Sequence, residues 1–408
     1  MSSPAISPPN IAPSAPRPPT AAAPAVAAAP FSTPALLAAM LKTSTKISDL
    51  FFTPGKPPLV EIGGKLAPAG TTRVLTCDDT RRIASDLIGK NQHALDNLKE
   101  FGSCDVSYSL PGTDRFRVNV FMQRGSCAVV MRVIPGKIPD FDSLHLPDEL
   151  KKIISLRNGI VLVTGPTGSG KSSTLAAIID RINTEQSYHV LTIEDPIEFL
   201  HPHKNCIVNQ RELHSDTPSF ALALRGALRQ APKVILVGEM RDKETIEIAM
   251  EAAETGHLVL STLHTIDASK TVERIVGVFP MAEQHTLRNR LAKSFRYIVS
   301  QRLVPRKDGA GRMAIIEILK STLRTREYVE KGESDGKTLL DAMRVGETEG
   351  MQCFDGDIER LIRAGTLDME TGLAYATNPG NLQLDMSDLK LEAEAEADSL
   401  LETSGDRR

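Results

Sequence analysis

Eight residues near the middle of the chain have the composition and spacing of a phosphate-binding loop. Residues 165–172 read Gly-Pro-Thr-Gly-Ser-Gly-Lys-Ser and fit the pattern G-x-x-x-x-G-K-[ST]. The glycines let successive backbone N–H groups point at phosphate oxygens, and the start of a following helix adds partial positive charge. The amine of Lys171 would reach the β and γ phosphates, and the hydroxyl of Ser172 would bind Mg²⁺. The segment predicts a nucleoside triphosphate site formed by Gly165, Pro166, Thr167, Gly168, Ser169, Gly170, Lys171 and Ser172.

Acidic residues follow two apolar runs that read as parallel strands. Glu198 follows the run at residues 189–193, and Glu239 follows the run at residues 234–237. Nucleotide hydrolysis needs carboxylates that hold Mg²⁺ and orient water, and the C-terminal ends of neighbouring parallel strands bring such groups together. Acidic residues after strands are also common helix caps, so each one alone is ambiguous. Beside a phosphate loop, the two together predict a catalytic pair.

A histidine follows a third strand-like run, at residues 257–261. The imidazole of His264 has the chemistry to donate a hydrogen bond to a γ-phosphate. A single histidine more often has a structural or solvent-facing role, and the residues alone leave both interpretations open.

These segments lie in a block where apolar strand-like runs alternate with helical stretches. Such alternation is typical of a parallel sheet covered by helices, so we predict an α/β fold. The strand-like runs are residues 160–164, 189–193, 234–237 and 257–261, and the helical stretches between them are residues 171–182, 219–229 and 243–254. Beyond Pro280 the pattern becomes mainly helical, with helices at 283–303 and about 337–345 and one strand at 314–319.

A small α+β domain is expected before this block. Its pattern predicts a short helix from Ala35, a helix at residues 81–98, and strands at residues 106–109, 115–122 and 128–134. Ten of the 26 prolines lie among the first 34 residues, which have little to bury and should form a disordered leader. The expected parts are a leader (1–34), an N-terminal domain (35–136), a linker (137–150), an ATPase core (151–280), a mainly helical part (281–384) and an acidic tail (385–408).

The overall composition excludes several classes of protein. Of the 408 residues, 41% are hydrophobic and 24% are charged, which excludes a fibrous, wholly disordered or membrane-embedded chain. A net charge of -3 argues against nucleic acid as a partner. No apolar stretch is long enough to suggest direct membrane insertion, and five scattered cysteines without a Cys-x-x-Cys pair indicate reduced thiols in a cytosol.

Four ordered segments carry a family resemblance. They resemble the phosphate loop, Asp box, Walker B motif and His box of type IV pilus retraction ATPases, the PilT-type members of the type II/IV secretion ATPase superfamily. The segments are Gly165 to Ser172, Thr192-Ile-Glu-Asp-Pro-Ile-Glu198, Val237-Gly-Glu-Met-Arg-Asp242 and Thr255-Gly-His-Leu-Val-Leu-Ser-Thr-Leu-His-Thr265. The resemblance extends from about Ile47 to Leu382, which leaves the leader and the tail outside it.

The resemblance implies a homo-hexameric, ATP- and Mg²⁺-dependent motor. Each subunit would pair a PAS-like N-terminal domain with a RecA-like P-loop motor domain. Glu239 stands at the Walker B position that helps Ser172 bind Mg²⁺, Glu198 would polarise water, and His264 would sense the γ-phosphate. The motor would be cytoplasmic, at the cytoplasmic face of the inner membrane. It would act on an inner-membrane pilus platform protein, possibly beside a paralogous pilus ATPase.

Arginines in residues 115–124 resemble those that the N-terminal domain of the family presents to nucleotide. Arg115 and Arg117 share one face of a strand because side chains alternate. Which of Arg115, Arg117, Arg124 and Arg132 serves is open, and a solvated basic strand is the competing interpretation.

Two departures from the family pattern keep other functions in view. Ala231-Pro232-Lys233 replaces the Asp-Pro-Asp that many relatives carry, which would alter Mg²⁺ handling or a subunit contact. Residues 323–332 lack a clean copy of the motif linked to retraction. The alternatives are an accessory nucleotide-binding subunit, a nucleic-acid motor, and a pilus-assembly or secretion ATPase. Assembly and secretion relatives usually carry a four-cysteine zinc module, whereas only Cys206 and Cys353 lie beyond residue 150.

Overall fold

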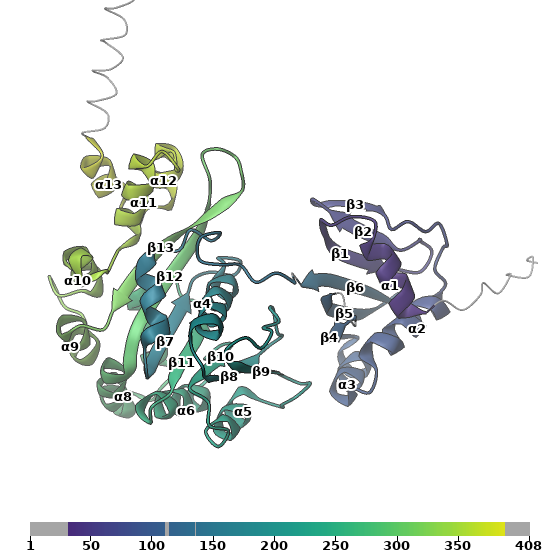
Figure 1. The fold of residues 1–408 in the computed structure, drawn as a ribbon, viewed down its shortest axis with the longest axis horizontal. Coiled ribbons are helices and arrows are strands. Elements are labelled where there is room, and N and C mark those ends of the chain that lie inside the picture. Colours follow the sequence, from purple (N-terminus) through teal and green to yellow (C-terminus); the bar gives the residue numbers. More distant parts are fainter. Residues whose placement is uncertain (1–31, 111–113, 135, 388–408) are drawn as a thin grey trace, which may run out of the picture.

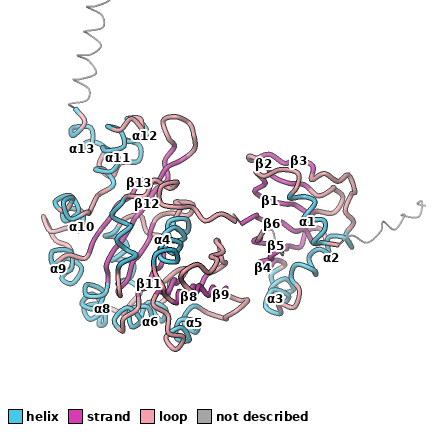
Figure 2. The backbone as a smooth tube through the Cα atoms, in the orientation of Figure 1, coloured by secondary structure: helices cyan, strands magenta, loops and turns pink. Residues whose placement is uncertain are grey.

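The described residues form two units, each built on its own sheet (Figure 1). A computed structural model describes residues 32–110, 114–134 and 136–387. The predicted leader and tail fall almost entirely outside these residues, although a helix begins at Thr33 within the expected leader. Residues 136–147 contain no helix or strand and lead from the first unit to the second (Figure 2).

The N-terminal unit is a six-stranded antiparallel sheet covered by three helices. The strand order is β3-β2-β1-β6-β5-β4. The strands are β1 (Ile47–Phe52), β2 (Leu59–Ile62), β3 (Lys65–Pro68), β4 (Ser103–Ser109), β5 (Arg115–Gln123) and β6 (Ser126–Ile134). The helices are α1 (Thr33–Leu41), α2 (Cys77–Ile88) and α3 (Gln92–Phe101). The predicted single helix at 81–98 is thus two helices, because Gly89 adopts a positive φ of 57° between them.

The C-terminal unit contains a seven-stranded sheet in the order β13-β12-β7-β11-β10-β8-β9. Its strands are β7 (Gly159–Thr164), β8 (His189–Glu194), β9 (Ile207–Glu212), β10 (Val234–Val237), β11 (Leu258–Leu263), β12 (Phe295–Pro305) and β13 (Arg312–Lys320). All neighbours pair in parallel except β12 and β13. The predicted α/β fold is confirmed, and the carboxyl ends of its central strands meet at one edge.

Helices cover both faces of this sheet because its strands are apolar on both sides. α4 (Lys171–Glu185) and the 3-10 helix η1 (Asp148–Ser155) pack on one face. The opposite face is covered by α5 (Phe220–Ala227), α6 (Lys243–Glu254), α7 (Ala268–Gly277), α8 (Met281–Ser294), α9 (Leu323–Lys331) and α10 (Leu339–Val345). A smaller cluster contains α11 (Phe354–Arg363), α12 (Met369–Tyr375) and α13 (Pro379–Asp385), and the short η2 (Glu347–Glu349) follows α10. None of the described helices has the length and apolar character needed to cross a bilayer.

The long helix predicted at residues 283–303 is wrong in its second half. The helix α8 ends at Ser294, and Phe295 begins strand β12. This strand lies between β7 and β13, and seven of its eleven residues are buried. Its aromatic and β-branched residues, Phe295, Tyr297, Ile298 and Val299, fit a central strand better than a helix. The region after residue 281 therefore contributes two strands to the sheet as well as helices.

Candidate functional site

The phosphate loop joins the end of β7 to the start of α4. Gly165 has a φ of +144°, and a Cβ there would lie 2.3 Å from the carbonyl oxygen of Gln301. The side-chain amide of Gln301 in turn donates to the carbonyl of Ser169 at 2.8 Å. Gly170 has a φ of +90° and no side chain caps α4, which leaves its first N–H groups toward the loop. The loop is thus shaped by β12 as well as by its own glycines.

Lys171 is the buried cation of this loop. Its Nζ donates to the carbonyl oxygens of Gly165 at 2.9 Å and Pro166 at 3.0 Å. The Nδ1 atom of His264 lies 3.5 Å away. Burial lowers the pKa of Lys171, and the nearby carboxylates of Glu239 and Glu198 oppose that shift. The loop therefore holds a positive charge close enough to two acidic residues to interact with them electrostatically.

Glu239 and His264 meet at the ends of β10 and β11. The Oε2 atom of Glu239 lies 3.6 Å from Nε2 of His264, and its other oxygen pairs with the guanidinium of Arg241. The hydrogen bond and charge of Glu239 raise the pKa of Arg241. The hydroxyl of Thr262 donates to the carbonyl of Gly238 at 2.7 Å, which ties the two strand ends together.

The loop that carries Glu198 leaves β8 and is held by side chains of β9. The backbone N–H of Ile197 donates to Glu212 at 2.9 Å, and that of His201 donates to Oε1 of Gln210 at 2.8 Å. The Gln210 amide also donates to the carbonyl of Phe199 at 2.8 Å. Sequence reasoning missed Gln210 and Glu212, because four of the six residues of β9 are polar and form no apolar run that would predict a strand.

One cavity of about 790 Å³ gathers the predicted site residues. Its lining includes Lys171, Ser172, Glu198, Glu239 and His264. From the rest of the predicted loop, Thr167, Gly168 and Gly170 line it, whereas Gly165, Pro166 and Ser169 do not. The arrangement places a cation, a hydroxyl and two carboxylates around a space that suits a phosphorylated ligand.

The oxygen donors at this cavity suit Mg²⁺. Magnesium prefers hydroxyl, carboxylate and phosphate oxygens, and Ser172 and Glu239 supply the first two. The Oγ atom of Ser169, inside the loop, is buried and has no hydrogen-bond partner within the described ranges. An orphaned polar atom of this kind fits a loop built to surround a polar ligand.

The four candidate arginines lie in different surroundings. Arg117 lines the 790 Å³ cavity, whereas Nη2 of Arg115 pairs with Glu212 at 2.6 Å. Arg124 lies at the turn between β5 and β6 with a φ of 47° and does not line the cavity. Arg132 pairs with Asp49 at 3.0 Å within the N-terminal unit. Arg117 therefore shares a cavity with the phosphate loop, whereas Arg124 and Arg132 do not line it, although Arg132 is the cross-strand partner of Arg117.

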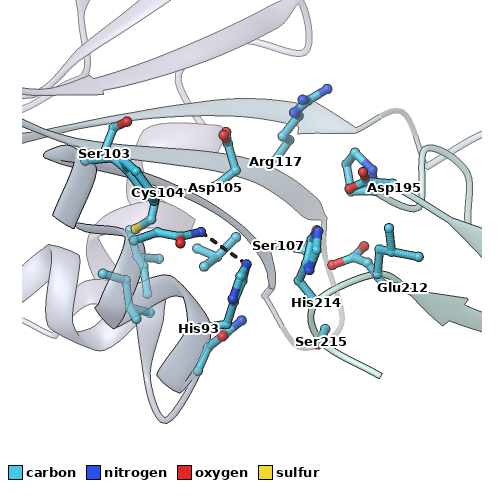
Figure 3. A pocket seen from close by; sticks show the side chains of 18 of the residues that line it. His93, Ser103, Cys104, Asp105, Ser107, Arg117, Asp195, Glu212, His214 and Ser215 are labelled. Carbon is cyan, nitrogen blue, oxygen red and sulfur yellow. Dashed lines mark hydrogen bonds between the residues drawn. The ribbon is translucent and has the colours of Figure 1, made fainter. Parts of the chain in front are cut away.

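A second cavity, of about 590 Å³, lies between the two units (Figure 3). The N-terminal unit contributes His93, Asp105 and Arg117, and the C-terminal unit contributes Asp195, Glu212 and His214. The rings of His93 and His214 stack with centroids 4.5 Å apart. Arg117 and Asp195 line both cavities, so the space between the units adjoins the phosphate loop.

Ala231, Pro232 and Lys233 lie at the opposite edge of the sheet from Glu239. The backbone of Lys233 bonds to the first residues of β8 and β11, His189 and Leu258. The four residues of β10 then separate Lys233 from the edge of the sheet that carries Glu239 by about 13 Å of strand. This placement argues against the expectation that the substitution disturbs Mg²⁺ handling directly.

Comparisons with known proteins bear on this geometry. A family model described as type II/IV secretion system protein matches residues 112–363. The chain is 42% identical over 334 residues to the type IV pilus retraction ATPase PilT of Pseudomonas aeruginosa, which covers 82% of this chain and 95% of that protein. It is 40% identical over 353 residues to the type IV pilus ATPase PilU of the same organism, covering 86% and 90%. The solved structure of the pilus retraction motor PilT with bound ADP is 40% identical and superimposes with a TM-score of 0.75, covering 84% and 98%.

Proposed function

Because this chain belongs to the type II/IV secretion system protein family and, within it, to the family of the pilus retraction ATPase PilT, we propose that it is an ATPase motor of type IV pilus retraction and twitching motility. The observation that supports this most is the single cavity lined by Lys171, Ser172, Glu198, Glu239 and His264. In this proposal the working form is a homo-hexamer, and each subunit binds ATP and Mg²⁺.

The chemistry is assigned to residues that already face one another. Lys171 exchanges its contacts with the Gly165 and Pro166 carbonyls for oxygens of the β and γ phosphates. Ser172 and Glu239 would hold Mg²⁺, which would supply positive charge to neutralise the phosphate oxygens. Glu198 orients the attacking water and accepts its proton, and the imidazole of His264 donates a hydrogen bond to the γ-phosphate. From β5, the guanidinium of Arg117 stabilises the charge that develops on transfer.

Force follows from contacts that exist only while the γ-phosphate is present. When hydrolysis removes those contacts, the two units of each subunit change their relative position. We assign the output of this movement to an inner-membrane pilus platform protein, with the motor at the cytoplasmic face of that membrane. Neither nucleic acid binding nor direct membrane insertion is part of the proposal.

An accessory subunit that works beside a paralogous pilus ATPase is the second candidate. The departures at Ala231-Pro232-Lys233 and residues 323–332 favour it, and the 40% identity to PilU means that the chain also resembles a pilus ATPase other than PilT. In that case the chain would bind nucleotide but depend on another motor for turnover. A pilus-assembly or secretion ATPase would use the same site. Expressing the chain in a strain that lacks its own retraction motor distinguishes this possibility, because only a retraction motor should restore pilus retraction.

ATP hydrolysis per subunit, measured over a range of protein concentration, tests the proposal. Specific activity should rise as subunits associate, and Glu198→Gln should lower kcat by at least about 100-fold while nucleotide binding persists. Glu185→Gln, at the end of α4 and outside the cavity, is the matched control and should keep the parent rate. Tight nucleotide binding without turnover in the parent chain would instead support the accessory role.

A further inference from the structure

Glu212 lies where the two units of the chain meet. It is the last residue of β9, and its side chain is only 7% exposed. Its Oε2 atom accepts hydrogen bonds from Nη2 of Arg115 at 2.6 Å and from the backbone N–H of Ile197 at 2.9 Å. One carboxylate oxygen thus joins β5 of the N-terminal unit to the residue that precedes Glu198. Figure 3 shows this carboxylate at the cavity between the units.

The backbone around Glu212 is fixed to the C-terminal sheet. Its N–H donates to Asp216 at 2.8 Å, and the N–H of Leu213 donates to the carbonyl of Glu194 at 2.9 Å. Glu212 is also the residue of β9 that pairs with Glu194 of β8. Because the backbone is anchored in this way, only the side chain of Glu212 is free to move. Its carboxylate accepts hydrogen bonds from both Arg115 and the N–H of Ile197.

Arg115 and Arg117 lie on the same face of β5 but make different contacts. Arg115 is 16% exposed and donates to Glu212 and to the hydroxyl of Ser109 at 3.1 Å. Arg117, two residues further along the strand, lines both cavities. The first arginine therefore anchors the strand to the C-terminal unit, and the second faces the phosphate loop.

We propose that Glu212 is a positioning residue that transmits movement of the N-terminal unit to Glu198. The inference rests on the proposed role of Glu198 in hydrolysis. When β5 shifts, Arg115 pulls on the carboxylate of Glu212, and the hydrogen bond from Ile197 to the same oxygen lengthens or rotates. Because Ile197 is bonded directly to Glu198, the catalytic carboxylate moves with it. Charge-assisted bonds at a largely buried site are strong enough to carry such a link.

A double-mutant cycle on Arg115 and Glu212 tests this link through kcat. Glu212→Gln keeps an oxygen for the Ile197 N–H but removes the charge that pairs with Arg115. Arg115→Gln and Glu212→Gln should each lower kcat by about tenfold with KM changed less than about twofold. The double variant should be no slower than the slower single variant, because both changes break one connection. Glu212→Met, which also removes the acceptor of Ile197, should be slower than Glu212→Gln.

Two control pairs of variants show whether the coupling is specific to Arg115 and Glu212. Arg117→Gln combined with Glu212→Gln should multiply the two losses, since Arg117 acts at the nucleotide and not through Glu212. Arg290→Gln combined with Glu254→Gln removes an arginine–carboxylate pair between α8 and α6, 2.8 Å long and away from both cavities, and should leave kcat unchanged. Thermal unfolding and binding of a fluorescent ADP analogue check that each variant is folded. If Arg115→Gln alone unfolds because Glu212 is left unpaired, the neutral double variant still reports the rate.

The outcomes separate this inference from the function on which it rests. An active parent whose Arg115→Gln and Glu212→Gln variants keep the parent kcat would overturn the link. Losses that multiply in their double variant would do the same. A parent without turnover, or one unaffected by Glu198→Gln, would instead refute the proposed hydrolytic role.

Discussion

At the scale of single residues, Glu317 of β13 lies under the His-box loop. Its side chain is buried, and its Oε1 atom accepts a hydrogen bond from the backbone N–H of Ala268 at 2.8 Å. Ala268 begins α7, four residues after His264, so this bond helps to position the loop that carries the imidazole. Burial raises the pKa of Glu317 to about 7, and the nearby Asp267 adds to that shift.

The raised pKa of Glu317 predicts a pH dependence of stability. The folded chain keeps the proton up to about pH 7, whereas the unfolded chain releases it near the ordinary value of 4.5. Between these values the folded state binds more protons, so stability from this group falls as pH rises. The melting temperature of Glu317→Gln should therefore lie close to that of the parent at about pH 5. At about pH 8 it should be several degrees higher relative to the parent than at pH 5. Thermal unfolding at both pH values checks this, with Glu330→Gln, an exposed carboxyl of α9, as the control.

A Glu317→Gln difference that stays constant with pH would contradict the assignment. It would mean that the carboxyl ionises alike in both states. ATP turnover by the same variant is a separate readout, since the amide oxygen of Gln still accepts the bond from Ala268.

At the scale of elements, the junction of β7, the phosphate loop and β12 is the tightest part of the site. We predict that Gly165→Ala lowers nucleotide affinity by at least about tenfold, because a Cβ meets the Gln301 carbonyl and a φ of +144° strains any other residue. Gly256→Ala is the matched control. Its φ is +110°, but nothing lies within 4 Å of the added atom, and it precedes β11 at the far edge of the sheet.

Titration of a fluorescent ADP analogue measures both variants. Equal losses of affinity in Gly165→Ala and Gly256→Ala would show that backbone strain alone, and not the contact with Gln301, governs the loop. Melting temperatures of the two variants show how much strain each position adds to the fold.

The elements also show what local sequence patterns can reach. Val234–Val237 is recognisable as a strand because a parallel strand buried on both faces is a continuous apolar run. Strand β12 is not recognisable in that way, since Ser300 and Gln301 interrupt its apolar residues. Those two polar side chains are buried because they bond to Thr164 and Ser169, more than a hundred residues away. Glu212 escapes notice for the same reason: its role depends on Arg115 and Ile197, which only the fold brings to it.

At the scale of the whole molecule, the two units have separate hydrophobic cores. One buried cluster draws its residues from the range 37–131, and the others begin at Phe141. The units are joined by the Arg115 to Glu212 ion pair and the His93 to His214 stack, which are small beside either core. Such units unfold as separate cooperative blocks.

We therefore predict two thermal unfolding transitions, and we expect Mg-ADP to raise the melting temperature of only one of them. The phosphate loop and most of its cavity belong to the C-terminal unit, so that unit gains the binding free energy, about 2.7 kcal/mol at a hundred times Kd. Differential scanning calorimetry with and without nucleotide measures this. A single transition that moves as a whole would mean that the units are coupled far more strongly than their contacts indicate.

The length of β10 also bears on how proteins of this kind diverge. The residues proposed to hydrolyse ATP follow the edge formed by Thr164, Glu194, Val237 and Leu263, while Ala231 and Lys233 occupy the other edge. A lineage can exchange acidic for basic residues at the second edge and leave the first one chemically intact. The surface residues of the second edge can then change without affecting ATP hydrolysis at the first. Two paralogues that catalyse the same reaction can in this way come to bind different partner proteins.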